Sequence, residues 1–444
     1  MRNIMQCEHK KEIGTTKIPG PHSAPHPEHQ TLITNVSIFN GTSETLITGK
    51  DVVLSGNKIE GFVPAGGEKN QYEKVIDGKG GYLSPGLIDM HWHMAFFVFF
   101  EDLAAIPVQY ASFLIARDAE AHLMRGFTTS RDAGGNVVGV QKAIDQGLIP
   151  GPRIYPSQAA IGCYSGHADF RNQNYQLKQW GGPLDPIEQI GAAALCNTAD
   201  EVRIATRNNL YQGATQVKLL TSGSVSGVAD PLYVSEFTQK EIEAAVEACE
   251  DFGTYVQVHC FNPRSIIRSL NAGVKSIEHG MLIDEEGMEM LVDKGAYFTP
   301  TVEVAVSLLD SPDKLMASKA RQALDATDNA MKLAKKYKAK VLFGTDMIFS
   351  DEAREVQAKE LTVRQKWFTN PEIMIQATGN AGEALWNLTG KRNPYGKVGV
   401  IEEGAMADII ILSKNFMEDV SVIEDAGNNL KLIMKDGKVY KNEL

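Results

Sequence analysis

The sequence is poor in cysteine, and its few cysteines show no pairing motif. Five are scattered over 444 residues without a CxxC pair: Cys7, Cys163, Cys196, Cys249 and Cys260. An odd, dispersed set of this kind fits reduced thiols better than a disulfide framework. We expect Cys260 to be a small buried hydrophobic side chain on the outer face of its strand.

Long apolar runs and basic blocks are also missing. No window reaches 18 uninterrupted apolar residues, and residues 1–11 lack the apolar core of a signal peptide. We therefore expect no membrane segment, and a cytoplasmic protein as the chain stands, or a secreted or periplasmic one if a leader was removed. The formal net charge of -11 and the absence of a Lys/Arg-rich block argue against a nucleic-acid partner.

The remaining composition is that of an ordinary globular protein, with 43% hydrophobic and 22% charged residues. The length suits an α/β barrel of about 250 residues or more together with a smaller domain. Residues 1–30 are charged, contain proline and four histidines, and show no hydrophobic periodicity, which predicts a flexible N-terminal arm. We interpret its histidines as solvated side chains, because no rigid element fixes their geometry.

Short alternating strands occur at both ends of the chain. They are predicted at residues 32–39, 51–54, 58–62, 407–412, 430–434 and 438–440. Each terminal block is small for an independent core, so we predict one discontinuous β-sandwich domain built from residues 31–83 and 398–444.

Between these blocks, residues 84–397 alternate strand-like and helix-length segments, which is typical of a (β/α)8 TIM barrel. Helices are expected at residues 102–125, 238–252 and 312–337, with Thr238 as a cap. The eight strands are predicted at residues 86–93, 128–132, 153–157, 216–220, 255–259, 274–279, 296–299 and 341–346.

Metal-ligating residue types gather at the ends of these strands, where a barrel builds its site. His91 and His93 alternate at the end of the first strand, so both side chains share one face. Each residue alone also fits an ordinary role, such as a helix cap or a satisfied core histidine. Their coincidence at the strands of one barrel predicts metal catalysis at a site that contains the following residues: His91, His93, Lys218, His259, His279 and Asp346.

From residue 32 to 440, the chain resembles the amidohydrolase superfamily. The likeness rests on PGLIDMHWH at 85–93, on the downstream Lys, His, His, Asp order, and on GVIEEGAMAD at 399–408. TTSRDAGG at 128–135, SGHAD at 165–169 and TSGSVSGV at 221–228 resemble the imidazolonepropionase-like branch, which contains Xaa-Pro dipeptidases and ochratoxin-cleaving amidases. Trp92 and Ala168 replace the smaller residues expected there. They change the expected shape of the pocket and remove no ligand.

The resemblance implies a binuclear site. His91, His93 and Asp346 would hold one divalent ion and His259 and His279 the other, with N6-carboxylated Lys218 bridging them. A metal-bridging hydroxide would attack the amide carbonyl, and Asp346 would pass its proton to the leaving nitrogen. Zinc is the default for such ligands, although manganese and cobalt also fit.

Five further residues are predicted to contact the substrate, and each has an alternative role. His167 would polarise the carbonyl, or bond Asp169 within its loop. Tyr233 would donate to the same oxygen, or pack in its loop. Arg264 would pair with a substrate carboxylate, or form a surface salt bridge. Phe96 and Phe97, in the apolar run 95–100, would line an acyl pocket, join a subunit interface or pack in the core.

The function predicted from these residues is hydrolysis of an amide bond in a small carboxylate-bearing substrate. We expect an N-acyl amino acid, an Xaa-Pro dipeptide or an ochratoxin A-like conjugate, cleaved by a homo-oligomeric enzyme. The alternatives are a cyclic amide hydrolase of imidazolonepropionase or hydantoinase type, and a barrel scaffold or binding protein without activity. Retention of all six ligand types disfavours the scaffold.

Overall fold

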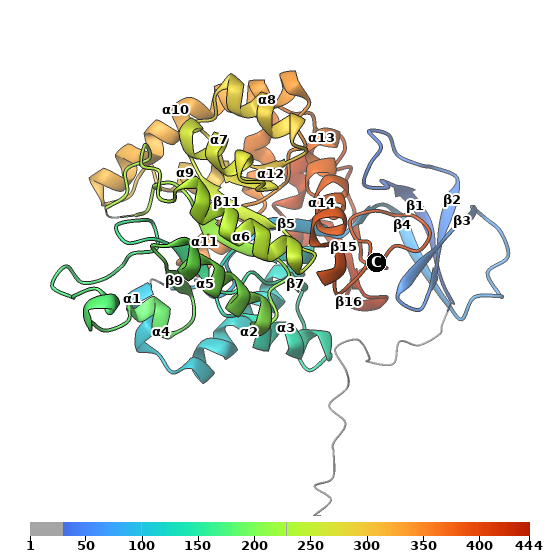
Figure 1. The fold of residues 1–444 in the computed structure, drawn as a ribbon. Helices are drawn as coiled ribbons and strands as arrows, with labels where there is room; N and C mark the ends of the chain where they lie inside the picture. Colours follow the sequence, from blue (N-terminus) through green and yellow to red (C-terminus); the bar gives the residue numbers. More distant parts are fainter. Residues whose placement is uncertain (1–29, 99, 228) are drawn as a thin grey trace, which may run out of the picture.

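The computed structural model describes residues 30–98, 100–227 and 229–444 (Figure 1). The predicted arm at 1–30, with its histidines and Cys7, lies outside these residues except for residue 30. The four cysteines within the described ranges are free and buried. No helix in those ranges is both long and apolar enough to cross a membrane.

Both ends of the chain contribute strands to one mixed sheet (Figure 1). Its order is β16-β15-β14-β4-β1-β2-β3, and β14 pairs antiparallel with β4. The structure confirms that both chain ends build one β domain, which is a single mixed sheet. Its strand β4 was not predicted, because three glycines interrupt the apolar pattern. The strands are β1 (Gln30–Ile38), β2 (Lys50–Ser55), β3 (Lys58–Pro64), β4 (Lys74–Pro85), β14 (Ile409–Leu412), β15 (Leu430–Lys435) and β16 (Lys438–Asn442).

The barrel strands form two parallel sheets, in the orders β5-β6-β7 and β13-β12-β11-β10-β8-β9. Residues 341–346 close one gap between them: Leu342 N donates to Phe298 O at 2.8 Å, and Met90 N donates to Phe343 O at 2.9 Å. The strands are β5 (Leu87–Trp92), β6 (Phe127–Asp132), β7 (Arg153–Tyr155), β8 (Ala160–Gly162), β9 (Ala193–Leu195), β10 (Val217–Leu220), β11 (Val256–Cys260), β12 (Ser276–His279) and β13 (Tyr297–Thr299).

Most barrel strands differ from their predicted bounds by one or two residues, and the third and eighth positions are irregular. The third, predicted at 153–157, ends at Tyr155, and the chain turns through Gln158, whose φ is +61°, before β8 pairs with β10. The eighth, predicted at 341–346, has a regular bridge only at Val341. Its backbone turns at Asp346, whose φ is +58°. Left-handed conformations at non-glycine residues interrupt a regular strand ladder, and apolar patterning does not reveal them.

Helices surround the barrel strands (Figure 1). The predicted helix 102–125 is divided at Pro107, which precedes α2, whereas α6 begins after Thr238 with a capping box to Glu241 as expected. The barrel helices are α1 (Phe100–Ala105), α2 (Val108–Met124), α3 (Val138–Asp145), α4 (Pro186–Gln189), α5 (Ala199–Gln212), α6 (Gln239–Asp251), α7 (Pro263–Asn271), α8 (Glu285–Asp293), α9 (Val302–Ser307), α10 (Lys314–Tyr337), α11 (Asp351–Glu355), α12 (Lys359–Val363), α13 (Asn370–Gln376) and α14 (Gly379–Thr389). A short α15 (Ala426–Asn429) precedes β15.

Candidate metal centre and active site

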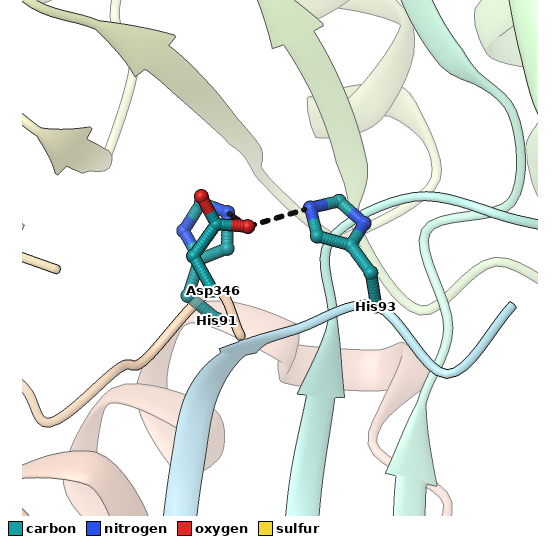
Figure 2. A group of neighbouring side chains, drawn as sticks. All are labelled: His91, His93 and Asp346. Atoms are coloured by element: carbon teal, nitrogen blue, oxygen red, sulfur yellow. Dashed lines mark ion pairs between the residues drawn. The ribbon is translucent and has the colours of Figure 1, made fainter. Parts of the chain in front are cut away.

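Two histidines and an aspartate meet at the end of β5 (Figure 2). Asp346 Oδ1 lies 3.3 Å from His93 Nε2 and 3.6 Å from His91 Nε2. The three ligand atoms lie within 4.8 Å of one another, a spacing that could hold one metal ion. Burial alone would raise the pKa of Asp346, but the imidazoles of His91 and His93 hold that pKa well below its usual range.

Lys218 and the other two predicted histidines adjoin this cluster. Lys218 Nζ lies 3.3 Å from His91 Nε2. The His279 ring lies 4.8 Å from that of His91 and 4.5 Å from that of His259, measured between ring centroids. All six predicted ligands therefore line one cavity, of about 650 Å³.

The second nitrogen of each imidazole has an oxygen partner in the protein. Nδ1 of His91, His93 and His279 lies 2.9, 3.1 and 2.7 Å from Glu278 Oε2, Gly134 O and Thr301 Oγ1, respectively. For His259 the partnered atom is Nε2, 3.3 Å from Gly223 O. Such partners orient a metal-ligating imidazole and fix its tautomer, leaving the other nitrogen for the ion.

The protonation of these groups suits a metal. Burial lowers the pKa of His279 to about 3 and that of His91 well below its ordinary value, so both are neutral imidazoles near pH 7. Burial also lowers the pKa of Lys218 to about 8, which leaves a usable fraction of neutral amine. Neutral imidazoles, a carboxylate and an amine able to take up carbon dioxide form a donor set that fits two divalent ions.

Apolar side chains form most of the remaining wall. Phe96 stacks on the His93 ring, with centroids 4.8 Å apart and ring planes inclined by 17°. Phe170, Ile187 and Val304 lie on other parts of the wall. A cavity of this size and character suits a small molecule with an apolar group.

His167 also lines the cavity. Its ring stacks on His259, with centroids 4.5 Å apart, and its Nδ1 lies 3.5 Å from Asp230 Oδ2. Asp169, the partner considered from sequence, is paired instead with Arg171. The His167 main-chain N–H donates to Glu236 Oε1 at 2.8 Å, which anchors the loop.

Three predicted substrate residues lie away from the cavity wall. Tyr233 is 78% exposed, and Arg264 is exposed in the first turn of α7. Phe97 is buried and packs in the hydrophobic core beside the cavity. The structure brings Phe96 and His167 to the ligands and does not bring these three side chains to them.

Trp92 points away from the ligands, as its place between His91 and His93 predicts. Its Nε1 donates to Asp118 Oδ2 of α2 at 3.1 Å, and the ring is fully buried. Glu278 and Arg131 contact the site although neither is among the predicted site residues. The available signal was a charged side chain inside a buried barrel strand, because such a charge needs a buried partner.

The chain is similar to known proteins over most of its length. Residues 82–440 match the model of the Amidohydrolase family. The chain is 30% identical over 373 residues to ochratoxinase from Aspergillus niger, covering 81% of this chain and 75% of that protein.

Solved structures give the same result. A crystal structure of an amidohydrolase has a TM-score of 0.86 at 31% identity, over 94% of this chain and 100% of that one. A prolidase complexed with N-methylphosphonate-L-proline has a TM-score of 0.85 at 28% identity, over 93% of this chain and 100% of that one. The protein belongs to the amidohydrolase family and is a hydrolase acting on C–N bonds.

Proposed function

We propose that the protein is a binuclear metal-dependent hydrolase that cleaves an amide bond in a small carboxylate-bearing substrate. The observation that carries this proposal is the convergence of six ligand-type side chains, from five barrel positions, on one apolar-walled cavity. Isolated structural roles would not require them to face the same space.

The residues present fit two divalent ions, with zinc as the expected metal. His91, His93 and Asp346 would hold one ion, His259 and His279 the other, and carboxylated Lys218 would belong to both. In forming the carbamate, the neutral Nζ of Lys218 bonds to the carbon of CO₂ and releases one proton. Bound ions would polarise the substrate carbonyl and lower the pKa of a water molecule toward 7.

Two side chains act directly on the reacting groups, one by proton transfer and one by hydrogen bonding. Asp346 accepts the proton of the attacking water and delivers it to the leaving nitrogen, a transfer that typically contributes about a hundred- to ten-thousand-fold. His167, beside Asp230, faces the cavity and is the candidate donor to the substrate carbonyl. Phe96 and the other apolar walls exclude water and contact the acyl or side-chain group.

The relatives support the substrate class. Ochratoxinase and a prolidase bound to a phosphonate analogue of proline are among the similar proteins, and the chain shares most of its length with both. We infer that the substrate is an N-acyl amino acid, an Xaa-Pro dipeptide or an ochratoxin A-like conjugate.

A substrate panel with defined metals tests the proposal. Metal-depleted protein would be reloaded with Zn²⁺, Mn²⁺ or Co²⁺ and assayed on Xaa-Pro dipeptides, N-acyl-phenylalanines, ochratoxin A and cyclic amides. We expect two metal equivalents by elemental analysis and turnover of a linear amide. Absence of bound metal, or turnover of cyclic amides alone, would contradict it.

A further inference from the structure

A charged pair occupies the centre of the barrel beneath the metal ligands. Arg131 of β6 donates from Nη2 to Glu278 Oε1 of β12 at 2.7 Å, and both side chains are fully buried. Barrel interiors are normally filled with branched apolar side chains. An ion pair at this position therefore calls for a specific role.

Hydrogen bonds to five partners hold the guanidinium of Arg131 in place. Nε donates to Met90 O, Nη1 to Tyr255 and Ser276 hydroxyls, and Nη2 to Glu278 and Thr299. These bonds use all five guanidinium N–H groups. They reach β5, β12, β13 and the residue before β11, so the guanidinium has one position relative to four barrel strands.

Glu278 divides its two oxygens between Arg131 and a metal ligand. Oε1 accepts from Arg131 and from Ser276 Oγ, the latter at 2.6 Å. Oε2 lies 2.9 Å from His91 Nδ1. Because Oε1 is fixed by two donors, Oε2 is fixed in direction as well, and a carboxylate oxygen can only accept.

The proton of a neutral His91 ring must therefore sit on Nδ1. Its Nε2 is then unprotonated and faces Asp346 Oδ1 at 3.6 Å and Lys218 Nζ at 3.3 Å. We propose that the buried Arg131–Glu278 pair is a positioning device that fixes the tautomer and direction of His91 as a metal ligand. This inference rests on the proposed metal centre.

Replacing one oxygen of Glu278 by an amide group tests the device. In Glu278→Gln, the two donors Arg131 and Ser276 hold the remaining carbonyl oxygen, so the NH₂ group faces His91 Nδ1. That contact favours the tautomer with its proton on Nε2, which removes the lone pair from the metal side. We expect the affinity for one of the two ions to fall about 10- to 100-fold.

Glu360→Gln is the matched control. Glu360 and Arg364 form a second fully buried pair, 2.8 Å apart, that touches none of the proposed ligands. Zinc stoichiometry and affinity, measured by elemental analysis and chelator competition, would be compared in wild type and both variants. The inference predicts a loss of zinc affinity in Glu278→Gln and wild-type zinc binding in Glu360→Gln.

The outcomes separate the two proposals. A wild type that binds no metal refutes the proposed function. A wild type with two ions and an unaffected Glu278→Gln refutes the positioning role alone, as does equal loss in both variants.

If Glu278→Gln does not fold, imidazole ¹⁵N NMR of metal-depleted wild type decides, with His91 assigned from a His91→Asn variant. Protonated Nδ1 and bare Nε2 support the device, and the opposite tautomer refutes it.

Discussion

Asp346 is the residue whose replacement tests the chemistry most directly, because its carboxylate lies near the imidazoles of His91 and His93 and lines the cavity. Asp346→Asn keeps the size of the side chain but removes its capacity to take up a proton. We expect turnover to fall at least about a hundredfold, the lower range for a lost general base. Circular dichroism and thermal unfolding should remain close to wild type. Full activity in the variant would refute the proton-transfer role.

Lys218 tests the proposed bridge. Lys218→Ala removes the amine that forms the carbamate and leaves a space beside His91 Nε2. We expect loss of metal and of most activity, and partial recovery when formate or acetate supplies a carboxylate in that space. ¹³C NMR of wild type with labelled bicarbonate should also show a carbamate that is absent from the variant. Unchanged metal content and rate in Lys218→Ala would contradict the bridge.

At the scale of elements, the contact between β5 and residues 341–346 matters most, because β5 carries His91 and leads directly into His93, and residues 341–346 carry Asp346. Buried Asp89 holds this contact. It accepts from Thr345 Oγ1 at 2.6 Å, Thr345 N at 3.2 Å, His91 N at 3.0 Å and Gln357 Nε2 at 2.8 Å. The hydrogen bonds to Asp89 thus connect β5 to residues 341–346, where the eighth barrel segment does not form a regular strand ladder.

We therefore expect Thr345→Val, which is nearly isosteric, to lower the free energy of unfolding by about 1–3 kcal/mol through loss of one donor to a buried carboxylate. Displacement of Asp346 relative to His91 should also weaken metal binding. Urea denaturation and zinc titration would measure the two effects. Thr345→Ser keeps the hydroxyl and should behave as wild type; equal effects in both variants would exclude this explanation.

The same contact shows what sequence patterns could and could not predict. Strand ends bearing His91, His93, Lys218, His259 and Asp346 are local features, so their convergence followed once the barrel was recognised. Most partners of Asp89 and Glu278 lie far away in sequence, and their contacts depend on strand register and rotamers. The direction of side chains beyond the strand ends was equally inaccessible, which is why Tyr233, in a loop, and Arg264, in the first turn of α7, were expected at the cavity but lie outside its wall.

At the scale of the molecule, a buried charge network joins the barrel to the terminal domain. Arg153 of β7 pairs with Asp408 at 2.7 Å and with Asp436 at 2.8 Å, both contributed by the C-terminal segment. Asp436 N also donates to Asp408 Oδ1 at 2.7 Å. Removing Arg153 alone would leave the carboxylates of Asp408, which is buried, and Asp436, which is half-buried, without their cation. The stability of both domains therefore depends on Arg153.

Lys435 of β15 lies beside this network and makes the free energy of unfolding depend on pH. Burial, and then the charge of Arg153, lower its pKa from 10.5 to about 8. The unfolded chain keeps the Lys435 proton up to pH 10.5, so between pH 8 and 10.5 it binds more protons than the folded chain. This residue's contribution to the free energy of unfolding therefore rises with pH in that window, and below pH 8 the buried ammonium is a constant cost.

Replacement of Lys435 by an apolar side chain should remove that cost. We expect Lys435→Met to raise the free energy of unfolding near neutral pH by up to about 3 kcal/mol, since each pKa unit corresponds to about 1.4 kcal/mol. The gain should disappear as the pH rises from 8 to 10.5. Denaturant titrations across this window measure it. Lys438→Met, an exposed change on the same hairpin, should alter stability by less than about 0.5 kcal/mol. Equal pH profiles for wild type and Lys435→Met would show that the Lys435 ammonium imposes no cost on the folded network.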